Sequence, residues 1–152
     1  MVRRVGRCAA FGRPDLCALA VEAAGRLRSP REVVLAWVDG FNRRDTLAAA
    51  APYHDDAVNT EVTAGRPTVR RQAVLEELLE FFRALPDNYT RPVIVFEDGE
   101  WAVRESSGEV LGGASFARLP ANGRSFTLQG CGFVQVIGGK ITFQRGSWDK
   151  AG

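Results

Sequence analysis

The sequence predicts an α+β fold in which three helices precede an antiparallel sheet. In the first half of the chain, apolar residues recur at spacings of three and four, as in helices with one buried face. In the second half, strand-forming segments are separated by Asp98-Gly99, Asn122-Gly123 and Gly138-Gly139, dipeptides that favour the tight turns of β-hairpins. Because the helices come before the strands, we expect them to pack together on one face of the sheet.

The first helix is predicted to begin at Pro30 and to run to about Asn42. Ser29 and Glu32 form a capping-box pattern around this proline, which favours the first position of a helix. The apolar residues that follow fall on one face. They are Val33, Val34, Trp37, Val38 and Phe41.

Asp45 is predicted to cap a second, shorter helix that continues through Ala50. Residues 57–62 tolerate β-structure and are followed by a Gly-Arg-Pro turn, so they are predicted to form a strand. A third helix is predicted to start at Thr68 and to stop before Pro86. Its broad apolar stripe contains Val74, Leu75, Leu78, Leu79, Phe81, Phe82 and Leu85.

From residue 89 onward the chain is predicted to be nearly all strand. The expected strands cover residues 90–97, 101–106, 125–137 and 141–148, with a glycine-rich stretch after the second.

The residues before these elements, 1–28, are predicted to be a basic, poorly packed appendage to a single domain at 29–152. Residues 1–31 hold seven arginines and two acidic residues, and glycine and proline interrupt the first half of the segment. The whole chain has 152 residues, 45% of them hydrophobic, which suits one globular domain.

Composition argues against several classes of function. The formal net charge of +2 is too small for a protein that neutralises phosphates, so we expect no nucleic-acid partner. No apolar run approaches the roughly 20 residues of a membrane span, so we expect no membrane partner. The three cysteines cannot all pair, and we expect a reducing, cytoplasmic location. With His54 as the single histidine and no phosphate-loop spacing among the glycines, we expect no metal and no other cofactor.

Five strings of the sequence carry a resemblance to a known family. They are WVDGFNRRD at 37–45, HDDAVN at 54–59, FEDGEWA at 96–102, GCGF at 130–133 and GKITFQRGSWD at 139–149. In this order they resemble the nuclear transport factor 2-like superfamily, and within it the SnoaL-like group of polyketide-cyclase-type and uncharacterised bacterial proteins.

The resemblance implies a cone-shaped fold in which a curved antiparallel sheet wraps around three N-terminal helices and leaves an apolar pocket. It also implies a homodimer, which we expect to form through the outer face of the sheet around Phe133, Val110 and Phe143. It does not imply one reaction, because this fold hosts isomerases, epoxide hydrolases, cyclases, dehydratases and proteins without catalysis.

Glu61 is the candidate catalytic residue. In similar ketosteroid isomerases a carboxylate at this position is the general base, and burial at a pocket mouth would raise its pKa. The alternative is an exposed glutamate at a strand end. Trp37 and Gly132 stand where those isomerases have an oxyanion-binding Tyr and Asp. Gly146 stands where the similar epoxide hydrolases have an Asp. The resemblance therefore disfavours both the ketosteroid isomerase reaction and the epoxide hydrolase reaction.

Strand alternation leaves one placement open. In the strand at 101–106, Trp101, Val103 and Glu105 share one face and Arg104 lies on the other. If the first face is turned inward, Glu105 is a second buried carboxylate; if it is turned outward, Arg104 enters the pocket.

Helix periodicity, strand alternation and the family register together predict the pocket. Its predicted substrate-binding residues are Trp37, Phe41, Tyr53, Asn59, Phe82, Trp101, Glu105, Val134, Gln144 and Trp148.

The predicted function is a cofactor-independent isomerase, cyclase or hydrolase that acts on a small apolar carbonyl or polycyclic compound, with Glu61 as general acid/base. The alternative is a non-catalytic module of the same fold that binds a small molecule or only dimerises. A third hypothesis is an accessory protein that docks through its basic residues 1–31. Burial of Glu61 in a pocket distinguishes the first hypothesis from the second.

Overall fold

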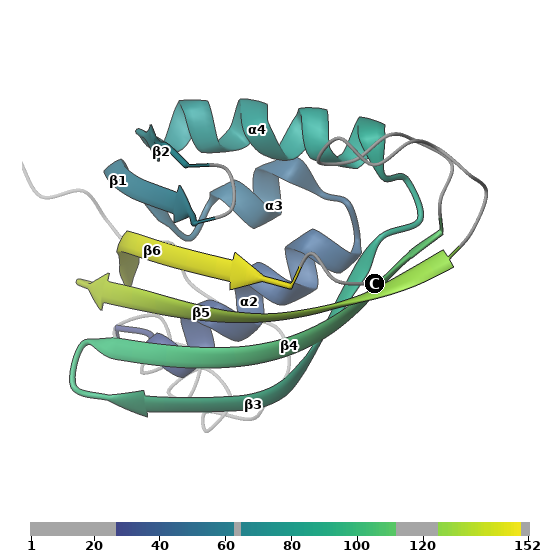
Figure 1. The fold of residues 1–152 in the computed structure, drawn as a ribbon. Helices are drawn as coiled ribbons and strands as arrows, with labels where there is room; N and C mark the ends of the chain where they lie inside the picture. Colours follow the sequence, from purple (N-terminus) through teal and green to yellow (C-terminus); the bar gives the residue numbers. More distant parts are fainter. Residues whose placement is uncertain (1–26, 63–64, 112–124, 150–152) are drawn as a thin grey trace, which may run out of the picture.

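The computed structural model describes residues 27–62, 65–111 and 125–149 (Figure 1). The predicted appendage at 1–28 therefore lies almost wholly outside the described residues, and so does the predicted turn Asn122-Gly123. Where the chain is described, it contains three helices and six strands. No described helix has the length and apolar composition needed to cross a membrane.

The first two helices lie where the sequence predicts them. Helix α2 spans Pro30–Asn42, and both hydrogen bonds of the capping box between Ser29 and Glu32 are present. Helix α3 spans Thr46–Ala50, and the Asp45 side chain accepts a hydrogen bond from the Ala48 N–H at 2.9 Å. Local capping signals are sufficient to place both helices.

The third helix starts later than predicted. Helix α4 spans Arg71–Ala84, and Pro67–Val69 form a short strand, β2, which pairs with β1 (Tyr53–Glu61). Arg70 has a φ of 81°, which is not helical, and its N–H donates to the Ala57 carbonyl at 2.8 Å. This bond to the sheet holds the chain in an extended form up to Arg70.

The remaining strands are β3 (Tyr89–Asp98), β4 (Trp101–Leu111), β5 (Ser125–Ile137) and β6 (Lys140–Trp148). The sheet has the order β2-β1-β6-β5-β4-β3. All neighbouring pairs are antiparallel except β1 and β6, which are parallel. The four strands after the helices are antiparallel, as predicted. The parallel pair arises because β1 belongs to the helical half of the chain and inserts beside the last strand.

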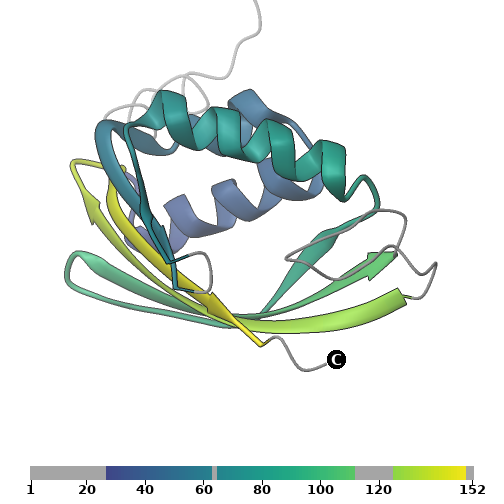
Figure 2. The same ribbon diagram turned by 45° about the horizontal axis from the view of Figure 1, so that its top comes forward.

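The sheet is strongly curved, and all three helices cover its concave face (Figure 2). The core fills the space between them, with Trp37, Phe41 and Leu78 buried as predicted. Phe82 is partly buried and packs against this core. The architecture confirms the predicted α+β fold with a curved sheet around three helices.

Candidate functional site

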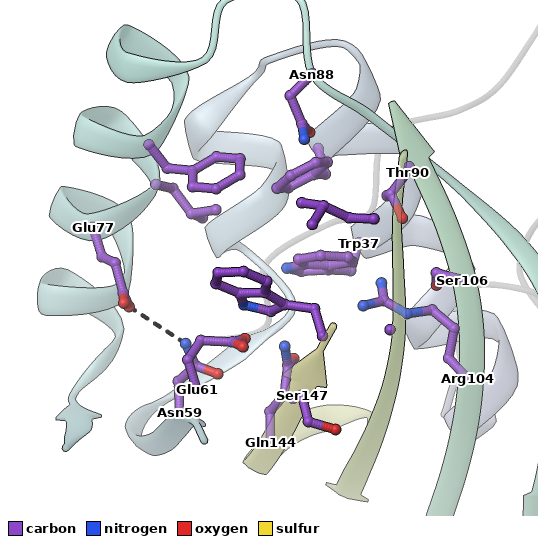
Figure 3. A pocket seen from close by; sticks show the side chains of 18 of the residues that line it. Trp37, Asn59, Glu61, Glu77, Asn88, Thr90, Arg104, Ser106, Gln144 and Ser147 are labelled. Carbon is purple, nitrogen blue, oxygen red and sulfur yellow. Dashed lines mark hydrogen bonds between the residues drawn. The ribbon is translucent and has the colours of Figure 1, made fainter. Parts of the chain in front are cut away.

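A cavity of about 730 Å³ lies between the concave face of the sheet and helices α2 and α4 (Figure 3). Much of its wall is aromatic or aliphatic, formed by Trp37, Phe41, Tyr53, Val74, Leu78, Phe81, Tyr89, Leu128 and Trp148. Its polar side chains are Asn59, Glu61, Glu77, Asn88, Thr90, Arg104, Ser106, Gln144 and Ser147. An apolar chamber with a small set of polar groups is typical of small-molecule sites.

Most of the predicted site residues line this cavity. They are Trp37, Phe41, Tyr53, Asn59, Glu61, Gln144 and Trp148. They come from α2, β1 and β6, the elements for which helix periodicity or the family register was informative.

Two predicted residues, Phe82 and Val134, belong to the core and not to the cavity lining. The Phe82 ring packs edge-on against Phe41, with the ring centroids 5.1 Å apart. Val134 is buried in the core cluster. Both are apolar residues on the predicted inner faces, and they pack within or against the core instead of lining the cavity.

The structure also corrects the placement of Trp101 and Glu105. Both side chains are exposed on the convex face of the sheet, whereas Ala102 and Ser106 are buried on the concave face and Arg104 lines the cavity. Of the two open alternatives for β4, Arg104 is therefore the residue that enters the pocket.

Sequence reasoning missed Glu77 and Ser106. Glu77 lies on the same face of α4 as Val74 and Leu78, so an acidic residue within a helical apolar stripe was the available signal. Ser106 shares the inward face of β4 with Arg104, and its placement follows once that face is known.

The central feature of the site is one row of residues across four strands. Glu61 on β1 pairs with Gly146 on β6, Gly146 with Gly132 on β5, and Gly132 with Arg104 on β4. The two charged residues thus stand at the ends of the row, and two glycines form the floor between them. Three interstrand spacings separate their backbones by roughly 14 Å, and the side chains reach inward from both ends.

The Glu61 carboxylate occupies the space above Gly146. A Cβ atom at position 146 would lie 2.6 Å from Glu61 Oε1 and 2.9 Å from Oε2. Burial raises the pKa of Glu61 from 4.5 to about 7, with a further rise from nearby Glu77 and an opposing effect of Arg104. At neutral pH both protonation states of Glu61 are therefore populated.

Arg104 is a half-buried cation that contacts an aromatic ring. Its guanidinium carbon lies 4.4 Å from the centroid of the Trp37 ring. Burial lowers the pKa of Arg104, while Tyr53 and Glu61 oppose this shift, and an arginine remains charged throughout the physiological range. No described residue accepts a hydrogen bond from Arg104 or forms a salt bridge with it.

Tyr53 and Gln144 form a buried pair in the wall of the cavity. The Tyr53 hydroxyl donates to Gln144 Oε1 at 2.8 Å. Burial raises the pKa of Tyr53 strongly, so the phenol stays protonated and serves as a neutral donor. Asn59 Nδ2 donates to Glu77 Oε2 at 3.3 Å (Figure 3).

Five buried polar atoms among the described residues have no hydrogen-bond partner, and all five belong to residues that line this cavity. They are Trp37 Nε1, Asn59 Oδ1, Asn88 Oδ1, Arg104 Nε and Ser106 Oγ. The Trp37 indole N–H lies near enough to Tyr53 to lower the pKa of that phenol slightly, but it does not reach hydrogen-bond geometry. Because buried polar groups are nearly always paired, this concentration points to a polar ligand.

In the described part of the chain, no group of three or more His, Cys, Asp or Glu side chains is arranged to hold a metal ion.

A family model for the SnoaL-like domain matches residues 34–144 of this chain. The matched segment contains Glu61 and Arg104 as well as most of the cavity wall. Among curated protein sequences, none matches this chain.

Several solved structures share the fold. The chain is similar to a SnoaL-like polyketide cyclase from Agrobacterium tumefaciens, with 20% identity, a TM-score of 0.71, and coverage of 81% of this chain and 93% of that one. It is also similar to IdmH from Streptomyces antibioticus, with 19% identity, a TM-score of 0.71, and coverage of 80% of this chain and 93% of that one. For TerC, co-crystallised with polyporic acid, the identity is 23% and the TM-score 0.66, and the match covers 80% of this chain and 92% of that one. At these identities the likeness shows the fold and not the reaction.

Proposed function

The chain belongs to the SnoaL-like domain family, and from this premise we propose that it is a cofactor-independent isomerase- or cyclase-type enzyme for a small, largely apolar carbonyl compound. Glu61 is the proposed general acid/base.

The position of Glu61 carries this proposal. The carboxylate lies inside the cavity above a floor of two glycines, with a pKa of about 7. A general base works best when its pKa is close to the operating pH, because it can then both accept and return a proton. An exposed glutamate at a strand end would have neither the cavity nor the raised pKa.

The reaction that fits is proton transfer at a carbon next to a carbonyl group. The ionised Glu61 takes a proton from this carbon, and the electron pair of the C–H bond moves toward the carbonyl oxygen as an enolate forms. Protonated Glu61 returns the proton at another carbon, or the enolate carbon attacks a second carbonyl of the same molecule, whose C=O π bond opens to an alkoxide that takes the proton from Glu61. The first outcome is an isomerisation and the second a cyclisation.

The walls and the similar structures support an apolar ligand with several rings. Trp37, Phe41, Phe81 and Trp148 supply aromatic surface around the cavity, and its volume is within the range that holds a drug-sized ligand. One similar structure is a polyketide cyclase, and another, TerC, was co-crystallised with polyporic acid.

Hydrogen exchange in D₂O tests the proposal. Small cyclic ketones such as 2-tetralone are incubated with the protein, and NMR measures the loss of α-hydrogen signals. We expect catalysed exchange in the wild type and a ~10²- to 10⁴-fold decrease in Glu61→Gln, the range that acid–base catalysis supplies.

Glu105→Gln is the matched control, because Glu105 is exposed on the opposite face of the sheet. It should exchange like the wild type. Equal exchange in the wild type and Glu61→Gln, or no catalysed exchange of any ketone tested, would favour the non-catalytic binding module.

A further inference from the structure

The cation of the cavity lacks an acceptor. Arg104 lines the cavity, yet no described residue accepts a hydrogen bond from its guanidinium, and its Nε is buried without a partner. Glu61 influences the pKa of Arg104 electrostatically, but no salt bridge joins the two. A charge that is partly withdrawn from water and has no hydrogen-bonding partner is costly, so an anionic occupant of the cavity would stabilise Arg104.

A second unpartnered donor lies beside Arg104. Ser106 is only 7% exposed, lines the same cavity, and has a buried Oγ without a partner. The two residues are neighbours on the inward face of β4, with Cα atoms about 7 Å apart. Figure 3 shows both side chains along one strand, with Glu61 on the opposite wall.

Space for a ligand atom next to Arg104 comes from a glycine. Gly132 pairs with Arg104, and a Cβ atom at position 132 would have no neighbour closer than 3.7 Å, so β5 places no side chain over the guanidinium. Trp37 covers one face of the guanidinium at 4.4 Å, which leaves the N–H edge for hydrogen bonds. Guanidinium groups bind planar oxyanions through this edge.

We propose that Arg104 and Ser106 form an oxyanion subsite, so that the cavity takes a planar organic anion: a ring compound with a carboxylate, or with an acidic enol or phenol. This inference rests on the proposed function in so far as it names the ligand class of the same cavity. In the proposed reaction the subsite also holds the carbonyl oxygen on which negative charge develops.

The acidic groups of the cavity couple binding of an anion to protonation. Glu61 from β1 and Glu77 from α4 face the cavity together with Arg104 and the Tyr53 phenol. The Cys131 thiol of β5 lies on the other face of the sheet but acts electrostatically on Arg104. A bound anion adds negative charge near Glu61 and favours its protonated form. Binding of an anion should therefore take up a proton near pH 7 and weaken as the pH rises above 7.

A comparison of 2-naphthoate with 2-naphthamide tests the subsite, because the two compounds have nearly the same shape and differ in charge. Isothermal titration calorimetry measures their dissociation constants at pH 7. We expect the wild type to bind naphthoate about 10- to 100-fold more tightly, the range for hydrogen bonds to a charged group. Arg104→Gln should abolish this preference and Ser106→Ala should reduce it several-fold.

Arg145→Gln is the matched control, since Arg145 is exposed on the same sheet, and it should keep the preference. Circular dichroism verifies the fold of each variant. If Arg104→Gln does not fold, Arg104→Lys replaces it. This variant keeps the charge but loses the planar fork of the guanidinium, so its preference for naphthoate over naphthamide should be reduced. Equal binding of naphthoate and naphthamide by the wild type would overturn the proposal. A preference that survives in Arg104→Gln, or no binding of either compound, would overturn it as well.

Glu61→Gln separates this proposal from the proposed function. The variant lacks the general base but keeps Arg104 and Ser106, so naphthoate should bind at least as tightly as to the wild type. If ketone exchange does not depend on Glu61 while the anion preference depends on Arg104, the catalytic proposal fails and the anion subsite stands. If exchange depends on Glu61 and the anion preference is absent, only the subsite fails.

Discussion

At the scale of single residues, the site depends on where side chains are missing. Gly146 has no side chain, and the Glu61 carboxylate fills the space that one would need. The last strand therefore provides no acid of its own, and the neighbouring strand β1 brings a carboxylate to the same place. Gly132, the next residue in the row, leaves space in the same way beside Arg104.

The variant Gly146→Ala should displace the carboxylate without unfolding the protein. The new Cβ would lie 2.6 Å from Glu61 Oε1, but this atom is the end of a flexible side chain and can move. We expect ketone exchange to fall by ~10²-fold, because catalysis is sensitive to displacements of about 1 Å. Arg145→Ala is the control, since Arg145 is next to Gly146 on β6 but is exposed on the convex face, away from the cavity. Similar rates in both variants would contradict this account.

Glu61 should also make stability depend on pH. Its pKa is 4.5 in an ordinary environment and about 7 in the folded protein, so between these values the folded state binds more protons than the unfolded state. The free energy of unfolding should therefore fall as the pH rises from about 4.5 to 7. NMR titration of the Glu61 carboxyl group should give the raised pKa directly.

Glu61→Gln removes this titration. We expect the variant to exceed the wild type in stability by about 1 to 3 kcal/mol at pH 8, and to differ little from it at pH 4. Urea unfolding at the two pH values measures the difference, with Glu105→Gln as the exposed control. A difference that does not change with pH would show that Glu61 titrates normally.

At the scale of elements, helix α2 fixes the start of β3 at the edge of the cavity. Asn42 Nδ2 donates to the Thr90 carbonyl and Asn42 Oδ1 accepts from the Thr90 N–H, both at 2.8 Å. Arg44 Nη2 donates to the Asn88 carbonyl at 3.0 Å. Asn88 and Thr90 line the cavity, so these bonds hold part of its wall against the helix.

Asn42→Ala should therefore destabilise the protein by about 1 to 3 kcal/mol, because it leaves two backbone groups of Thr90 without partners. It should also increase hydrogen exchange at the Thr90 amide. Asp39→Ala is a suitable control, since it removes only an exposed ion pair with Arg43, which contributes at most about 0.5 kcal/mol. An equal loss of stability in both variants would contradict the role of Asn42.

The elements also show which features a sequence can predict. The caps at Ser29 and Asp45 act within three residues, so α2 and α3 could be placed from local signals. The start of α4 could not, because it depends on the bond from Arg70 to Ala57 on another strand. Alternation divides the residues of β4 into two sets, but only the curvature of the whole sheet decides that Arg104 faces inward and Glu105 outward.

At the scale of the whole molecule, the convex face of the sheet is the main apolar surface among the described residues. Phe96, Val103 and Phe133 are aligned across three strands. The exposed fractions of Phe96 and Phe133 are 56% and 49%. Trp101 packs edge-on against Phe143 on the same face, with ring centroids 6.1 Å apart. Extended apolar patches of this kind mark interaction surfaces.

We predict that this face forms a homodimer, in which a second copy covers the aromatic side chains of the first. Sedimentation should show a dimer at micromolar concentration, and Phe133→Asp should shift it to a monomer by placing a charge in the interface. Leu47→Asp is the control, because Leu47 is 72% exposed on α3, away from the sheet. The monomeric variant should keep the preference for naphthoate, since Phe133 is exposed on the face of the sheet opposite the cavity. A wild type that sediments as a clean monomer at micromolar concentration would contradict the predicted dimer.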